Sequence, residues 1–359
     1  MKLNRQELLN KSASEIKMLV EQHGSVFVTY LGINTILVQH IFVADEKLQS
    51  LEYSPSEQFE EILPNIWWRE YTLPKVKNLC YWLYKNCLQY ADEEKYEEKR
   101  NSLIVQDKYC KNTLPFFDSK GNEYFKQTYI LPIASCKNKV NLVSNKISFF
   151  SKTLQEDREL IIEYTKSVNV NKPYKFLIVA DGEVWKYSLN LGNWLGQISK
   201  DKNLIICYIV QKDRNQELPL NKKFCKFVSH DIVNYLTDKF AATYNPDNFI
   251  FWGQSFGGLA AIGLDMYCPN RIGTIICQSA SLWWDKEQKI INFYSKHKPN
   301  CRFYYSYGVC ENNFITNDGA RFKSFLAPVK QCRFNIFAGG HDYISWLNDL
   351  MFAMKNFVI

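Results

Sequence analysis

Ser255 is the centre of a G-x-S-x-G pattern, Gly253-Gln254-Ser255-Phe256-Gly257. The pattern lies where an apolar, strand-like run (NFIFW) meets a helix-forming one (FGGLAAIGLDMY). A sharp strand-to-helix turn pushes a serine hydroxyl above the edge of a sheet, and the flanking glycines avoid collisions with the neighbouring chain. The positive end of the helix dipole then favours an oxyanion at the same point. The sequence therefore predicts a nucleophilic serine at position 255.

A serine nucleophile needs a base, which in this arrangement is a histidine later in the chain. Two histidines follow Ser255: His297, in the polar segment YSKHKPN, and His341, directly after the strand-like run RFNIFAGG. A residue that follows a parallel strand lies at the carboxyl edge of the sheet, on the side where the serine is expected. We therefore predict His341 as the base and His297 as a residue of a polar helix end.

The third member is expected to be a carboxylate between the serine and the histidine in chain order. Glu311 follows the strand-like run RFYYSYGV, which immediately precedes the strand of His341, so it is the preferred partner. Asp318, seven residues further on, is the rival.

Two backbone N–H groups are expected to hold the oxyanion. The first is the amide of Phe256, the residue after the nucleophile. The second comes from the turn after KFLIVAD, where the amides of Gly182 and Glu183 are the candidates.

The elements that must position these residues change character along the chain. From about residue 155, short apolar strands alternate with amphipathic helices, which predicts a parallel sheet covered on both faces. Residues 25–43 and the segments up to about 147 are β-rich, and a helix is expected near residues 5–22. The predicted fold class is α/β: an α/β-hydrolase with a mostly parallel, doubly wound sheet in residues 151–359, preceded by a small N-terminal β-sandwich-like domain in residues 1–150.

The composition is that of a soluble globular protein, with 46% hydrophobic and 23% charged residues among 359. No run reaches membrane-spanning length and no secretory signal is visible, so we expect a cytosolic protein without a membrane partner. The eleven cysteines show no metal-ligand spacing, and the net charge of +7 is spread along the chain. Neither a nucleic-acid partner nor a resident metal or organic cofactor is expected, and the oligomeric state stays open.

Several segments together resemble the enterochelin (enterobactin) esterases, also called siderophore esterases. The matching pieces occur in order through the C-terminal part: DGEVW at 181–185, RNQELPLNKKF at 214–224, GQSFGGLAA at 253–261, QSASLWW at 278–284, GVCE at 308–311 and GGHDYISW at 339–346. The resemblance implies the same three roles: Ser255 as nucleophile, His341 as general base and acid, and Glu311 as its partner.

The resemblance also implies a substrate, a tricatechol trilactone siderophore whose ester bonds are cleaved in the cytoplasm, usually as the iron complex. Such a bulky aromatic anion suits cationic and aromatic side chains, and Arg214, Trp185, Trp283 and Trp284 are the candidates. The competing interpretations are an internal ion pair of Arg214 with Glu217 and core positions for the tryptophans. The alternative functions are hydrolysis of another acyl ester or thioester, and binding of a ferric siderophore without catalysis.

Overall fold

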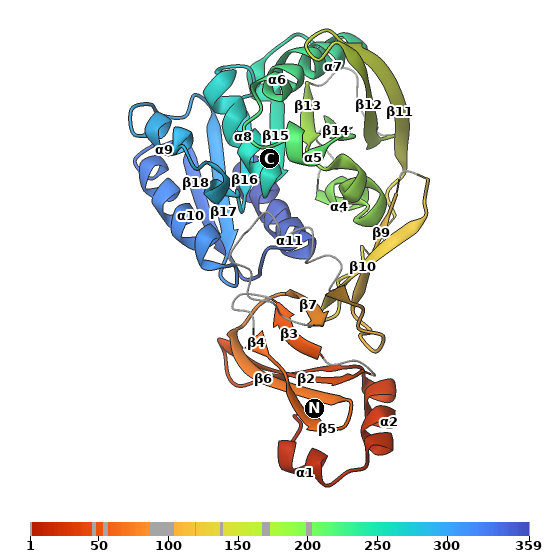
Figure 1. Cartoon of the computed structure of the whole chain (residues 1–359). Helices are drawn as coiled ribbons and strands as arrows, with labels where there is room; N and C mark the ends of the chain where they lie inside the picture. The colour runs from red at the N-terminus through yellow and green to blue at the C-terminus, as the bar shows by residue number, and fades with distance from the viewer. Residues whose placement is uncertain are drawn as a thin grey trace.

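The computed structural model describes residues 2–44, 48–52, 57–85, 104–118, 120–136, 139–166, 173–198 and 203–358. An eight-stranded sheet forms the centre of the C-terminal part, in the order β11-β12-β14-β13-β15-β16-β17-β18 (Figure 1). Its strands are β11 (Leu142–Ser151), β12 (Glu156–Thr165), β13 (Tyr174–Val179), β14 (Asn203–Ile209), β15 (Phe249–Gln254), β16 (Thr274–Gln278), β17 (Arg302–Gly308) and β18 (Cys332–Phe337). Only β12 runs against its neighbours, so seven of these strands are parallel.

Helices cover both faces of this sheet, because its central strands are apolar on both sides. One face packs against η1 (Val184–Ser188), α4 (Leu191–Ile198) and α11 (Tyr343–Ala353). The other packs against α6 (Lys222–Lys226), η2 (Phe227–Ile232), α7 (Val233–Lys239), α8 (Phe256–Tyr267), α9 (Lys289–Tyr294) and α10 (Asn313–Leu326). The shorter pieces are α5 (Arg214–Glu217), η3 (Pro246–Asn248), η4 (Leu282–Trp284) and η5 (Met354–Val358).

Two antiparallel sheets form the N-terminal part. The first has the order β1-β2-β6-β5: β1 (Val26–Tyr30), β2 (Thr35–Val43), β6 (Ile66–Pro74) and β5 (Glu60–Leu63). The second has the order β4-β3-β7-β10-β9, with β8 also paired to β7: β4 (Glu57–Gln58), β3 (Leu48–Glu52), β7 (Cys80–Lys85), β10 (Glu123–Tyr129), β9 (Thr113–Phe117) and β8 (Ile104–Val105). Val38 of β2 and Tyr81 of β7 share one buried core, so the two sheets pack as a sandwich. The expected fold class is confirmed for both parts.

The single helix expected near residues 5–22 is two helices, α1 (Arg5–Leu9) and α2 (Ala13–His23). Ser12 caps α2: its hydroxyl accepts from the Glu15 N–H, and the Glu15 carboxylate accepts from the Ser12 N–H. This capping box starts a new helix at a point where helical periodicity continues, which explains the difference. Helix α10 also begins at a capping residue, because the Asn312 side chain accepts from the Ile315 N–H.

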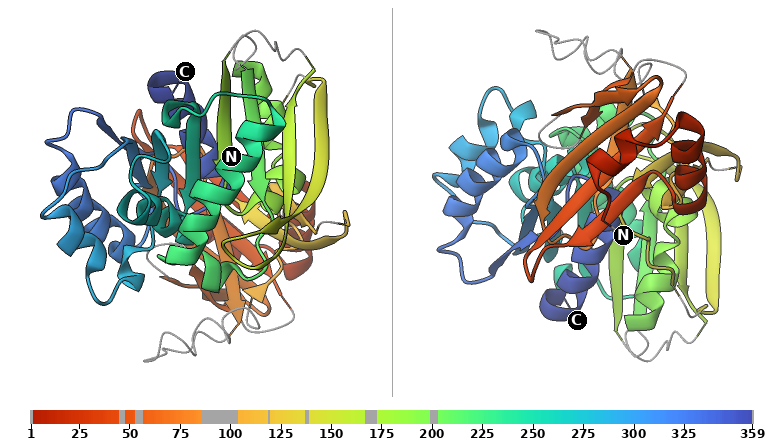
Figure 2. Two further views of the ribbon diagram at one scale, coloured as in Figure 1. Left: turned by 90° about the horizontal axis from the view of Figure 1, so that it is seen from above. Right: turned by 90° about the horizontal axis from the view of Figure 1, so that it is seen from below.

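The division at residues 150/151 stays a prediction. Strand β11 begins at Leu142 and pairs along its whole length with β12, so the large sheet starts before that division. In the view from below, the N-terminal strands and helices lie across the end of the large sheet (Figure 2). The Lys77 N–H donates to the Ala338 carbonyl at 3.1 Å, which joins the N-terminal part to the loop that precedes α11.

Candidate active site

Ser255 lies between β15 and α8 in a backbone conformation that L-residues rarely adopt, with φ 56° and ψ −119°. A Cβ atom at Gly253 would collide with the backbone of Gly257, so the turn requires glycine there. The Ser255 N–H donates to the Gln278 carbonyl of the neighbouring strand at 3.0 Å. Strain of this kind persists where the surrounding structure holds it in place. The expected strand-turn-helix elbow is therefore present.

Three side chains that are distant in sequence form a chain of hydrogen bonds. Ser255 Oγ lies 3.0 Å from His341 Nε2, and His341 Nδ1 lies 2.8 Å from Glu311 Oε2. The His341 side chain is 37% exposed, whereas that of Glu311 is fully buried. The structure thus brings Glu311, rather than Asp318, to the imidazole. A solvent-accessible serine and imidazole backed by a buried carboxylate is the geometry of an activated nucleophile.

The order of parallel strands explains why these residues meet. Strands β15, β16, β17 and β18 are consecutive neighbours, so the residues that follow them share the carboxyl edge of the sheet. Ser255 follows β15, Glu311 follows β17 and His341 follows β18. His341 therefore meets Glu311 across one strand spacing and Ser255 across three.

The expected oxyanion turn lies beside the elbow. Strand β13 pairs with β15 in parallel, and just past its end the Ala180 N–H donates to the Trp252 carbonyl at 3.1 Å. A Cβ atom at Gly257 would lie 3.1 Å from the Ala180 Cβ, which shows how closely the two turns approach. The backbone of Asp181 is left-handed, with φ 52°, so the chain turns sharply there. The turn at Asp181 therefore lies beside the start of α8, and the oxyanion role of the Gly182 and Glu183 amides stays a prediction.

Arg214 contacts the oxyanion turn and not Glu217. Its Nε donates to Asp181 Oδ1 at 2.7 Å and its Nη2 to Asp181 Oδ2 at 3.1 Å. Gln254, the residue before the nucleophile, also donates to Asp181 Oδ2, at 3.2 Å. The buried Asp181 carboxylate therefore ties α5, the oxyanion turn and the elbow together.

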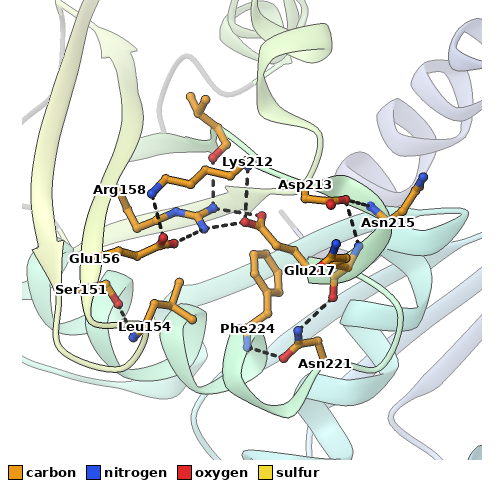
Figure 3. A network of polar contacts seen from close by, with 12 residues as sticks. Ser151, Leu154, Glu156, Arg158, Lys212, Asp213, Asn215, Glu217, Asn221 and Phe224 are labelled. Atoms are coloured by element: carbon orange, nitrogen blue, oxygen red, sulfur yellow. Dashed lines mark hydrogen bonds and ion pairs between the residues drawn. The ribbon is translucent and has the colours of Figure 1, made fainter.

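Glu217 pairs instead with Arg158 of β12, as Figure 3 shows. Two N–H groups of the buried Arg158 guanidinium donate to the Glu217 carboxylate, at 2.6 and 3.0 Å. Glu156 and the Val210 carbonyl accept from the same guanidinium, at 3.0 and 3.2 Å. This network fixes α5 against the sheet, and the sequence-based alternative that paired Arg214 with Glu217 is wrong.

The tryptophans predicted to bind substrate have different environments. Trp185 is fully buried, with its ring centroid 4.2 Å from that of Trp252, so it belongs to the core and its assignment to the binding surface is corrected. Trp284 is 43% exposed and its ring centroid lies 5.0 Å from that of Phe256, next to the nucleophile. The guanidinium of Arg214 lies 5.3 Å from the centroid of the Phe256 ring. A cation and two aromatic rings thus lie together beside Ser255.

Trp283 lines a cavity of about 210 Å³ between η4, α9 and α10. The cavity is lined by Leu282, Trp283, Asp285, Lys286, Gln288, Ile290, Ile291, Asp318 and Arg321. Asp318, the rival for the third position of the relay, therefore belongs to this cavity.

Residue-by-residue prediction missed three polar contacts of the site. Ser281 Oγ lies 3.2 Å from Ser255 Oγ, and the Ser279 hydroxyl donates to Glu311 Oε1 at 2.5 Å. The indole N–H of Trp346 donates to Ser279 Oγ at 2.9 Å. All three lie in the segments QSASLWW and GGHDYISW, whose resemblance to the esterases was the available signal.

A sequence family described as putative esterases matches residues 151–357, which is more than half of the chain. The chain belongs to this esterase family. The matched range includes every residue of the Ser255–His341–Glu311 relay, and it begins at the end of β11.

Individual proteins are also similar to this chain. The iron(III) enterobactin esterase of Escherichia coli strain K12 is 24% identical over 240 residues, 63% of this chain and 60% of that protein. The chain thus spans about 60% of the length of this relative. The crystal structure of the ferric enterobactin esterase from Salmonella typhimurium superposes with a TM-score of 0.76 at 15% identity, over 95% of this chain and 99% of that one. The crystal structure of the enterobactin esterase of Shigella flexneri, in the presence of enterobactin, superposes with a TM-score of 0.73 at 19% identity. The match covers 96% of this chain and 98% of that one.

The structural matches show that both parts of the fold are shared, since they extend over nearly the whole chain. In the described part of the chain, no helix is long and apolar enough to cross a membrane. Nor do three or more His, Cys, Asp or Glu side chains of the described residues group as a metal site would require.

Proposed function

We propose that this esterase hydrolyses the ester bonds of a catecholate siderophore such as enterobactin, with the iron complex as substrate. The observation that carries the proposal is the relay from Ser255 through His341 to Glu311, with heavy-atom distances of 3.0 and 2.8 Å. The relatives named as enterobactin esterases and the shared two-part fold support the choice of substrate. The ferric ion is cargo of the substrate and has no resident site in this proposal.

In the proposed reaction, Ser255 attacks a lactone carbonyl while His341 Nε2 takes the hydroxyl proton. Glu311 keeps the imidazole in the tautomer that presents a lone pair to the serine and stabilises the imidazolium that forms. The amides of Phe256 and of Gly182 or Glu183 hold the oxyanion. As the C–O bond of the intermediate breaks, the proton on His341 Nε2 passes to the leaving oxygen, which gives a seryl ester and a free hydroxyl group on the leaving part. Water activated by His341 then releases the acid and restores Ser255.

The surface next to the serine suits an aromatic anion. Trp284 offers an exposed ring for stacking on a catechol and packs against the buried ring of Phe256, and Arg214 offers a cation that is 35% exposed although it pairs with Asp181. Trp283 and the cavity that it lines are a second candidate region for an arm of the substrate. We propose that the reaction takes place in the cytoplasm, as the resemblance to the siderophore esterases implies.

Product analysis of ferric enterobactin with the parent protein and with Ser255→Ala tests the proposal. The parent is expected to release the linear trimer and smaller esters, and Ser255→Ala is expected to lose about 1000-fold or more of this turnover. Hydrolysis by Ser255→Ala at the parental rate would contradict the proposed nucleophile.

A comparison of substrates separates the proposal from the alternatives. The siderophore esterase is expected to have a far higher kcat/KM for the trilactone than for short acyl esters or thioesters. The reverse preference would indicate another ester substrate. Binding of the ferric siderophore without turnover, together with no fluorophosphonate adduct on Ser255, would indicate a binding protein.

A further inference from the structure

Trp346 of α11 contacts His341 directly and is linked to Glu311 through Ser279. Its buried ring lies with its centroid 4.8 Å from that of the His341 imidazole, at an interplanar angle of 80°. Its indole N–H donates to Ser279 Oγ at 2.9 Å, and the Ser279 hydroxyl donates to Glu311 Oε1 at 2.5 Å. One side chain therefore borders the imidazole and begins a hydrogen-bond chain that ends on the carboxylate.

The direction of this chain is fixed by chemistry. An indole N–H can only donate, so Ser279 Oγ must accept from it, and the hydroxyl proton of Ser279 is left to point at Glu311. The backbone of Ser279 is left-handed, with φ 47°, which is uncommon for a residue other than glycine, asparagine or aspartate. Its N–H donates to the Ser306 carbonyl at 2.7 Å, which holds that conformation. A strained residue that aims its only hydroxyl at a buried carboxylate points to a role in the site.

Glu311 Oε1 thereby receives two donors, the Ser279 hydroxyl and the Gly308 N–H at 2.7 Å. Its other oxygen, Oε2, faces His341 Nδ1. With Oε1 held on both sides, the carboxylate cannot rotate away from the imidazole. The ring of Trp346 limits the rotation of the imidazole itself.

We propose that Trp346 and Ser279 are positioning residues, which hold Glu311 and His341 in the orientation that keeps the Nε2 lone pair on Ser255. This inference rests on the proposed function. It concerns the speed of proton transfer and not the recognition of a substrate. Loss of the contacts made by Trp346 and Ser279 should therefore lower kcat with little change in KM.

The test uses the full chain, a short p-nitrophenyl ester and a fluorophosphonate probe, so it does not depend on the identity of the natural substrate. Ser279→Ala removes the donor to Glu311, and Trp346→Phe keeps a ring beside His341 but removes the N–H. We expect kcat and the rate of Ser255 labelling to fall about tenfold or more in Ser279→Ala and less in Trp346→Phe, with KM unchanged within about twofold.

Tyr294→Phe is the matched control. The buried Tyr294 hydroxyl donates to the buried Asp265 carboxylate at 2.8 Å, so this variant loses a comparable hydrogen bond outside the site. It is expected to lose stability but to keep the parental kcat. A control that loses kcat as much as Ser279→Ala would show that any buried lesion has this effect, and would overturn the inference.

Coupling to Glu311 separates positioning from a general loss of structure. In a Glu311→Gln background the charge that Ser279 orients is already absent, so Ser279→Ala should have little further effect on the labelling rate. Fully multiplicative effects of the two substitutions would overturn the inference. If Ser255 were labelled at the parental rate in both Ser279→Ala and Trp346→Phe, the inference would also be overturned. A parent protein that fails to label at Ser255 would instead refute the proposed function.

Discussion

Glu311 and Asp318 show how one carboxylate differs from another that is seven residues away. Glu311 lies at the end of β17, fully buried and 2.8 Å from the imidazole, whereas Asp318 lines the cavity beside α10. We expect Glu311→Gln to lower kcat by about 100- to 10,000-fold, because the amide cannot stabilise the imidazolium. Asp318→Asn, the matched control, should stay within about threefold in kcat for a short ester. Steady-state kinetics gives kcat for both variants. A larger loss of kcat in Asp318→Asn than in Glu311→Gln would make Asp318 the partner of His341.

Helix α11 carries a buried carboxyl at its start, one residue after His341. Asp342 caps the helix by accepting from the Ser345 N–H at 2.8 Å, and it also accepts from the Ser345 hydroxyl at 2.9 Å. Burial raises the pKa of Asp342 to about 6 despite these donors. The folded protein therefore holds this proton more tightly than the unfolded chain does.

The raised pKa of Asp342 makes the stability of the fold depend on pH. The contribution of Asp342 to stability is fully present below about pH 4 and is lost as the pH rises through about 6, with a total of about 3 kcal/mol. Asp342→Asn does not titrate, so this part of the decline should disappear. Free energies of unfolding, obtained from urea denaturation at several pH values between 4 and 7, measure this decline in the parent and in Asp342→Asn. Parallel curves for the parent and the variant would contradict the prediction.

The N-terminal sandwich and the esterase part meet at the loops that carry His341 and Glu311. Leu79 packs against Gly340, where an added Cβ would overlap its side chain, and the Cys80 N–H donates to Asp342 Oδ2 at 3.4 Å. Cys310, next to Glu311, belongs to the buried core of the sandwich. The sandwich therefore contacts the loops of the site as well as covering the end of the sheet.

Two truncations in the same core separate support of the site from general stability. Leu79→Ala and Ile36→Ala each remove a large aliphatic side chain that is fully buried or nearly so, and each is expected to cost about 2–5 kcal/mol of folding free energy. Only Leu79→Ala should also lower kcat of the folded protein, by about tenfold, because it opens space beneath the His341 loop. Urea unfolding together with kinetics on a short ester checks both. Equal kcat values for the two variants would show that the sandwich does not position the loop.

The sequence by itself determined the strands β13 to β18, the elbow at Ser255 and the chain order of Ser255, Glu311 and His341. These features depend on local periodicity, on glycines that the turn requires, and on the rule that parallel strands end at one edge. The same local information placed Glu311 ahead of Asp318, because Glu311 follows its strand directly.

Only the tertiary structure decided which side chains pair across that edge. Arg214 pairs with Asp181, which lies 33 positions away in the sequence. Glu217, only three positions from Arg214, forms its ion pair with Arg158. Trp185 and Trp284 are the same residue type, yet Trp185 is buried in the core and Trp284 lies exposed beside Phe256. The contact of Trp346 with Ser279 spans 67 positions. Such pairings depend on how the sheet and its covering helices pack together, and no short stretch of sequence encodes that packing.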